Sequence, residues 1–171
     1  GVARFAGFFL RGNPFRAAES LIRYHWARDE RATVSVTESL GQSKSPLTVD
    51  ELLESLDDPR FYVRFEAIVS IARRGADARL TQALIEVLEE GGPALSVVAA
   101  WALGRIGDAE ALPALRAGLD AEYRSIRAHC ARSLGSMGDP DAVALLLDRL
   151  PLEHNEDLRV AFGSALGALG A

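Results

Sequence analysis

The residues best suited to chemistry in this 171-residue chain are three histidines and one cysteine. His25, His129 and His154 lie in an N-terminal arm, on a predicted helix and in a predicted loop, so nothing in their spacing brings them together. A metal site needs several ligands that meet at one point. A single cysteine, Cys130, excludes an intrachain disulfide and a cysteine-cluster zinc site. We therefore predict no metal site, no cofactor, no catalytic residue and no enzyme activity.

Arginines recur at one position of a repeated pattern, at Arg64, Arg127 and Arg159. Asp58 and Asp120 stand six and seven residues before the first two, in expected turns between helices. The planar guanidinium suits bidentate links to carboxylates. We expect an Asp–Arg ladder that ties stacked turns together, and an anion-binding stripe is the alternative.

The elements that position these residues follow from an internal repeat. Four similar segments end in glycines at 75, 107, 138 and 170, spaced by 32, 31 and 32 residues. Glycine takes the left-handed conformation that ends a helix at the least cost. Apolar residues precede each glycine in steps of four, which keeps them on one helix face. They stand at 63, 67 and 71, at 95, 99 and 103, at 126, 130 and 134, and at 158, 162 and 166.

Each repeat is predicted to contain two helices, with first helices at 48–56, 79–89, 109–119 and 140–149. A lone two-helix unit would leave its apolar face exposed, so the units must stack. The prediction is an all-α fold, an α-solenoid (superhelix) of four repeats at about 47–75, 76–107, 108–138 and 139–170, preceded by a helical N-terminal extension. Cys130 falls on the apolar face, which indicates a buried small hydrophobe rather than a nucleophile.

The repeat resembles the HEAT-like family, in the short variety first associated with phycobilisome lyases. The resemblance rests on Ile126 to Gly135, closed by Gly138-Asp139-Pro140, and on Leu103 to Asp108. It implies a scaffold fold that serves many unrelated partners. HEAT-like hydroxylases that bind iron carry repeated His-Glu dipeptides, whereas this sequence has only the reverse order, Glu153-His154.

Charge is unevenly distributed. The N-terminal arm and linker, residues 1–46, begins with a basic, aromatic-rich stretch: residues 1–31 carry a net charge of +3, and the remaining 140 residues carry −8. The total of −5 argues against nucleic-acid binding, which depends on phosphate neutralisation. The aromatic rings of the arm either cap the core or, through residues 1–31, contact a membrane surface. A helix is expected over residues 14–28.

Two segments add a second resemblance. Arg11 to Phe15 and Gly41 to Leu53 are similar to the segment that joins a bacterial major facilitator superfamily transporter to a cytoplasmic HEAT-like tail. The resemblance implies a non-catalytic regulatory module on the cytoplasmic side of the inner membrane, with the transmembrane part of its own full-length chain as a possible partner. The missing initiator methionine fits a fragment. The alternatives are a stand-alone cytoplasmic scaffold protein and a phycobilin-lyase-like enzyme.

A protein partner is expected to bind the concave side of the array, which the second helices line. Trp101 differs most from its repeat equivalents, and an exposed tryptophan flanked by arginine is typical of interaction hot spots. Packing of Trp101 against the arm is the alternative. The candidate face comprises Phe65, Arg73, Trp101, Arg105, His129 and Arg132.

The last repeat carries three consecutive leucines, Leu145, Leu146 and Leu147. Consecutive helical positions cannot all face one core. At least one leucine must therefore lie on a flank of the repeat, and a homodimer through the C-terminal repeat is predicted.

Overall fold

The computed structural model describes residues 30–171, in which every regular element is a helix. The expected helix over 14–28 and the aromatic rings of the arm lie outside these residues. The chain divides into two units, residues 1–83 and 84–171. Helix α6 (Ala78–Glu90) crosses the boundary between them.

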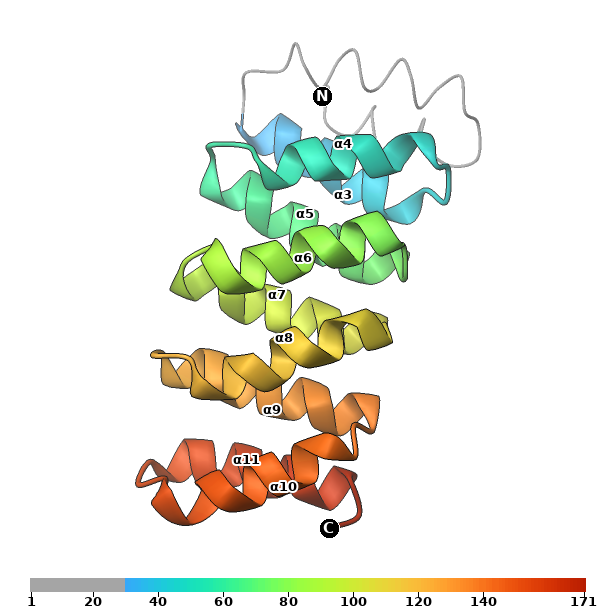
Figure 1. Ribbon diagram of the computed structural model, residues 1–171. Coiled ribbons are helices and arrows are strands. Elements are labelled where there is room, and N and C mark those ends of the chain that lie inside the picture. The colour runs from blue at the N-terminus through green and yellow to red at the C-terminus, as the bar shows by residue number, and fades with distance from the viewer. Residues whose placement is uncertain (1–29) are drawn as a thin grey trace. The chain divides into compact units, whose positions relative to one another are not determined.

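In the first unit, α3 (Glu30–Gln42) and α4 (Leu47–Leu56) both pack against α5 (Phe61–Arg74) (Figure 1). Helix α3 falls within the segment expected to be an arm and linker. It lies along α5, and Val36 and Leu40 on its inner face are buried. A Cβ atom at Gly41 would lie 2.5 Å from the Cβ of Ser70, so this residue must be glycine for the two helices to approach so closely.

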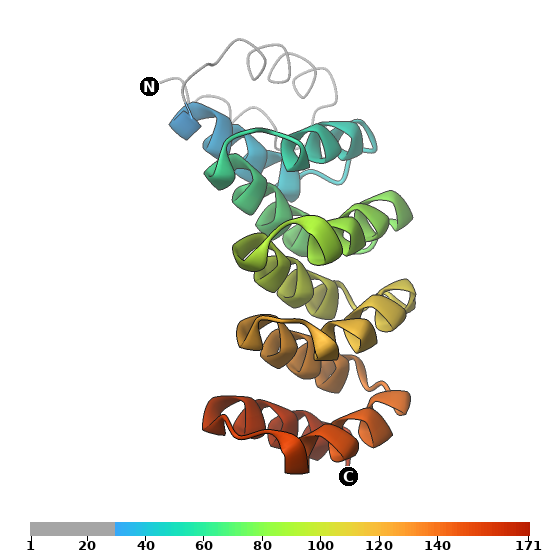
Figure 2. The same cartoon turned by 60° about the vertical axis from the view of Figure 1, so that its left-hand side comes forward.

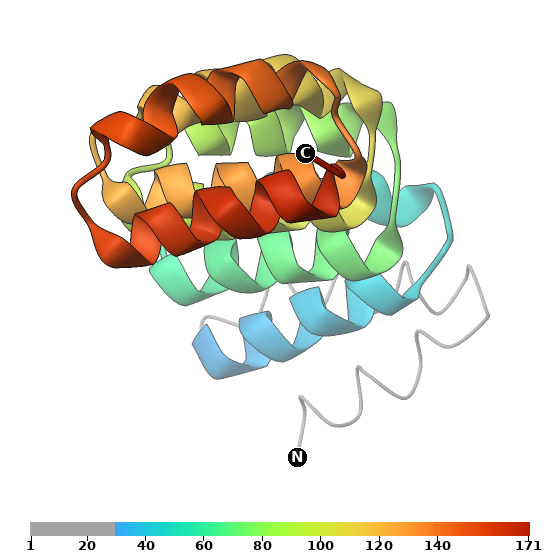
Figure 3. The same cartoon turned by 90° about the horizontal axis from the view of Figure 1, so that it is seen from below.

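In the second unit, three helices stack in one layer (Figure 2): α7 (Pro93–Ile106), α9 (Arg124–Met137) and α11 (Glu156–Ala168). The other layer contains α8 (Leu112–Ala117) and α10 (Asp141–Arg149), as the view from below shows (Figure 3). Short 3₁₀ segments flank the helices of that layer: η1 (Ala109–Ala111), η2 (Gly118–Asp120) and η3 (Leu150–Leu152).

Glycines end the second helices as the repeat spacing predicts. The C-cap residues Gly107 and Gly138 are left-handed, with φ of 74° and 71°. Gly75 also has a positive φ, 97°, at the end of α5. The expected helix at 109–119 is instead a short α-helix between two 3₁₀ turns. Gly118 lies at its end, where a Cβ atom would be 2.3 Å from Cys130 Sγ, so glycine lets α8 meet α9.

The predicted core is confirmed. All of the twelve apolar positions in steps of four are buried, from Val63 on α5 to Leu166 on α11. Neighbouring second helices cross at small residues. A Cβ atom at Gly104 would lie 2.3 Å from Ser133 Oγ, and one at Gly135 would lie 2.9 Å from Ala165 Cα. The fold class, an all-α solenoid of two-helix repeats, is therefore as predicted.

Candidate functional site

A hollow of about 650 Å³ lies between the N-terminal halves of α9 and α11. Its lining combines cationic, aromatic and apolar side chains, because α9 begins with Arg124 directly after Tyr123 and α11 turns Val160 toward the same space. The lining residues are Tyr123, Arg124, Ser125, Ala128, His129, Arg132, Asn155, Asp157, Leu158 and Val160.

The arginines of this hollow are free to bind an anion. Neither Arg124 nor Arg132 forms an ion pair or hydrogen bond with any residue from 30 to 171. His129 Nδ1 lies 2.8 Å from the carbonyl oxygen of Ser125, and it must donate its proton there because a carbonyl only accepts. Asp157 is the single carboxylate of the lining. The hollow therefore presents uncompensated positive charge on an acidic chain.

The six residues of the predicted partner face are divided between the units. In the second unit, Trp101 is 40% exposed and Arg105 is exposed on α7, and His129 and Arg132 line the hollow. A role for these four residues in binding a protein partner stays a prediction.

The first unit holds the other two. Phe65 packs beside Phe61, with ring centroids 6.3 Å apart. Arg73 is engaged in ion pairs with Glu66 at 3.3 Å and Glu38 at 3.6 Å, so it is not a free cation.

The expected Asp–Arg ladder does not form, because no ion pair or hydrogen bond joins Asp58 or Asp120 to any of its three arginines. Arg64 Nε instead donates to the carbonyl oxygen of Leu56 at 2.9 Å, and Arg127 donates to that of Ala121 at 2.7 Å. The guanidinium of each reaches back to the carbonyls that end the preceding first helix.

The carboxylates of the expected ladder have other partners. Asp58 binds Arg60, which stands only two residues away, at 2.6 Å. Asp120 is bound by Arg149. Arg159 is exposed and has no partner within the described part of the chain.

Arginines do link neighbouring repeats, but through the first helices. Arg116 donates to the Asp139 carboxylate from Nε at 2.7 Å and from Nη2 at 2.6 Å. This hydrogen bonding holds the pKa of the buried Asp139 carboxyl below its ordinary value. Arg149 donates to the Asp120 carboxylate from the same two nitrogens, at 2.9 and 2.6 Å, and these hydrogen bonds lower the pKa of Asp120. Arg79 pairs with Asp50 in the first unit. The 29-residue separation of Asp50 from Arg79 and of Asp120 from Arg149 was the sequence signal for this ladder.

Cys130 is buried, as predicted. Its side chain is fully enclosed, and burial raises the pKa of the thiol to about 12. Within residues 30–171 no three His, Cys, Asp or Glu side chains come together as a metal site would require. None of the helices from α3 to α11 is long and apolar enough to cross a bilayer.

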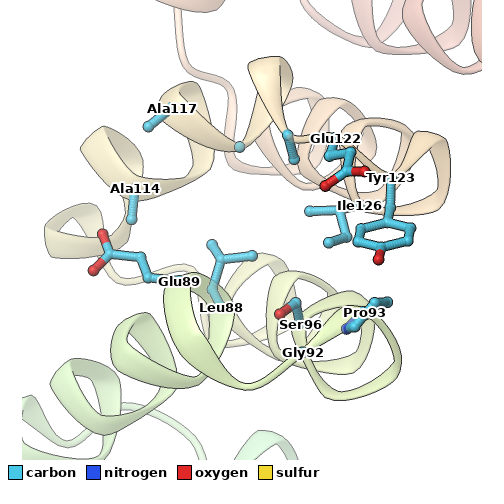
Figure 4. A pocket seen from close by; sticks show the side chains of 12 residues that line it. Leu88, Glu89, Gly92, Pro93, Ser96, Ala114, Ala117, Glu122, Tyr123 and Ile126 are labelled. Carbon is cyan, nitrogen blue, oxygen red and sulfur yellow. The ribbon is translucent and has the colours of Figure 1, made fainter.

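A second pocket, of about 370 Å³, is lined by the C-terminal end of α6, the N-terminal end of α7 and the turn that leads into α9. In Figure 4, Glu89 approaches from the C-terminal end of α6 and Glu122 from the turn before α9, on opposite sides of Leu88 and Ile126. Glu89 and Glu122 have no distinctive spacing in the sequence, because exposed glutamates near helix ends are common, and neither was predicted as a site residue.

Stacked two-helix repeats without strands in residues 30–171 define an all-α helical repeat protein. The family profile described as HEAT repeats matches residues 81–167, slightly more than half of the sequence. The chain belongs to the HEAT repeat family.

Two curated proteins are similar in sequence. Phycocyanobilin lyase subunit beta of Thermosynechococcus vestitus is 36% identical over 104 residues, which cover 61% of this chain and 48% of that protein. Deoxyhypusine hydroxylase-B of Oryza sativa subsp. japonica is 34% identical over 92 residues, 53% of this chain and 30% of the hydroxylase. The chain thus spans half or less of each relative.

Two solved structures share the fold over 99% of this chain, both at 21% identity. Human deoxyhypusine hydroxylase in complex with glycerol gives a TM-score of 0.63 and is covered to 62%. The complex of CpcE and CpcF of phycocyanin lyase from Nostoc sp. PCC7120 gives a TM-score of 0.55 and is covered to 77%.

These similarities correct two predictions. The chain was expected to be a non-catalytic module attached to a major facilitator superfamily transporter, and its sequence relatives are instead a lyase subunit and a hydroxylase. The prediction of no enzyme activity is contradicted by the same relatives. The HEAT-like resemblance, including its link to phycobilin lyases, is confirmed.

Proposed function

We propose that this chain is a subunit of a bilin-lyase-type enzyme and that the hollow between α9 and α11 binds the carboxylates of a bilin. The lyase subunit matches a longer segment, at higher identity, than the hydroxylase does. The three histidines also lack the repeated His-Glu order of iron-binding HEAT-like hydroxylases.

The observation that carries the proposal is the pair of unpaired arginines in a partly apolar hollow. A bilin is an open-chain tetrapyrrole with a flat conjugated body and propionate side chains. Neither Arg124 nor Arg132 is paired within residues 30–171. Each can therefore bind a propionate with two parallel N–H donors, the bidentate geometry that guanidinium favours. Val160 and Tyr123 offer apolar and aromatic surface to the conjugated body. The volume of about 650 Å³ lies in the usual range for small-molecule sites.

The residues of the hollow would bind and orient the bilin. Arg132 follows His129 on α9 by three residues, so both project from the same face of that helix. His129 is fixed by its bond to Ser125, which leaves Nε2 as an acceptor for a pyrrole N–H. A lyase subunit also needs a protein that receives the bilin, so the expected protein partner is retained in this proposal, and a cytoplasmic location stays a prediction.

An absorbance titration tests the proposal. Phycocyanobilin added to the protein should give a shifted and sharpened long-wavelength band that saturates with one bilin per chain. The double variant Arg124→Gln/Arg132→Gln should weaken binding at least ten-fold. Arg159→Gln removes an exposed arginine of α11 that does not line the hollow, so it should bind like the unmodified chain. An unshifted spectrum, or equal loss in both variants, would overturn the proposal.

A further inference from the structure

The pocket of Figure 4 has a composition opposite to that of the hollow. Its walls come from the end of α6, the start of α7, the end of α8 and the turn into α9. Leu88, Ala114, Ala117 and Ile126 give it an apolar interior. Its only charged lining residues are Glu89 and Glu122, and both are exposed.

Neither carboxylate is neutralised by the protein. Glu89 and Glu122 form no side-chain ion pair or hydrogen bond with the part of the chain that the structure describes. Arg124, two residues after Glu122, forms no ion pair with it, and Arg127 donates to the backbone carbonyl of Glu122 and pairs with Glu153. An apolar interior between two unpaired carboxylates is complementary to a ligand with an aliphatic stem and a cationic end.

We propose that this pocket binds a lysine side chain of a protein partner. The four methylene groups of lysine pack on Leu88 and Ile126, as lysine stems commonly lie on apolar surface. The ammonium group at the end of the stem can donate to one of the two carboxylates, Glu89 or Glu122, which lie on opposite sides of the apolar interior. An anionic side chain would be repelled there, and a purely apolar one would gain nothing from the two exposed carboxylates.

Tyr123 lines both this pocket and the basic hollow, so a partner held by its lysine would lie beside the hollow. The lysine site nevertheless stands on its own observations. It requires no bilin, and the failure of bilin binding would leave it unaffected.

Peptide titration followed by NMR provides the test. The probe is a lysine flanked by glycines, acetylated at the N-terminus and amidated at the C-terminus, and its matched control carries acetyl on the lysine Nζ. The lysine peptide should shift the amide signals of Leu88, Ala117 and Tyr123 in a saturable way. The acetylated peptide should bind at least ten-fold more weakly, because acetylation removes the charge and keeps the stem.

Variants complete the design. Glu89→Gln/Glu122→Gln should weaken binding of the lysine peptide at least ten-fold. Glu90→Gln changes the adjacent exposed glutamate, which does not line the pocket, and should leave binding unchanged. The three substituted glutamates are exposed, so the circular dichroism spectra of the variants should match that of the unmodified chain. Saturable binding that acetylation or the double variant does not weaken, or the absence of shifts around the pocket, would overturn the proposal.

Discussion

The crossing of α9 and α11 offers a direct test of how the repeats stack. Gly135 is buried in this crossing, and a Cβ atom there would lie 2.9 Å from Ala165 Cα and 3.2 Å from its Cβ. The nearest atom belongs to the backbone, so it cannot move aside as the end of a flexible side chain could. Gly135→Ala should therefore force α9 and α11 apart. Gly163 on α11 is the matched control, because its Cβ position is open.

The expected magnitude follows from two opposing terms. Glycine to alanine inside a helix stabilises by about 0.5–1 kcal/mol, and both variants gain this term. Overpacking a well-packed contact costs about 1–3 kcal/mol, and Gly135→Ala alone bears this cost. Gly163→Ala should thus be more stable than the unmodified chain. The free energy of unfolding should differ between the two variants by about 1–3 kcal/mol, or roughly 2–12 °C in Tm for a chain of this size.

Thermal and urea unfolding followed by circular dichroism at 222 nm measure both variants on the same footing. Because the propensity gain is common to the two, their difference isolates the steric contact. If Gly135→Ala unfolds at the same temperature as Gly163→Ala, or at a higher one, the close crossing of α9 and α11 is refuted.

Three further predictions rest on single groups. The pKa of Asp139 is lowered in the folded chain, so its contribution to stability is complete above the ordinary value of 3.8 and is lost as the pH falls through the folded pKa. Asp139→Asn should therefore lower the free energy of unfolding at neutral pH, and its urea midpoint should fall less steeply as the pH is lowered into the acid range. An equally steep fall would contradict the pairing of Asp139 with Arg116. Cys130, whose thiol pKa is raised to about 12, should react with a disulfide reagent at pH 8 only as fast as the chain unfolds, and rapidly in denaturant. Leu147 is 51% exposed, which confirms that one leucine of the last repeat lies on a flank, and the homodimer stays a prediction. Light scattering at high concentration should show a dimer that Leu147→Glu dissociates and Ala144→Glu, on the same helix, does not.

The helical core could be predicted because it depends on local periodicity. Steps of four residues place side chains on one face wherever the helix lies, and glycine ends a helix by its own conformational freedom. Pairing of charges could not be predicted in this way. An arginine side chain can reach several carboxylates and carbonyl groups with similar free energy. Sequence spacing therefore did not predict the partners of Arg64 and Arg127, which donate to carbonyl groups.

Helix α3 was missed although its signal is present in the sequence. Leu40-Gly41 has the same form as Leu103-Gly104 and Leu134-Gly135, and Gly41 stands 63 residues, two repeat lengths, before Gly104. In each case the glycine meets a small residue of a neighbouring second helix. Helix α3 ends at Gln42 and not at a glycine, so the glycine at the helix crossing marks the repeat better than the glycine at the helix end.

The same contacts explain why the transporter resemblance misled. Its longer segment runs from Gly41 to Leu53, and the residues that made it distinctive have structural roles within the first unit. Gly41 is small because Ser70 of α5 lies against it. Arg74 at the end of α5 binds the carbonyl oxygen of Ser45 at 3.0 Å and the hydroxyl of Thr48 at 2.6 Å, which fixes the turn between α3 and α4. A segment that any stacked helix pair needs for its own crossing and turn carries no information about a membrane partner.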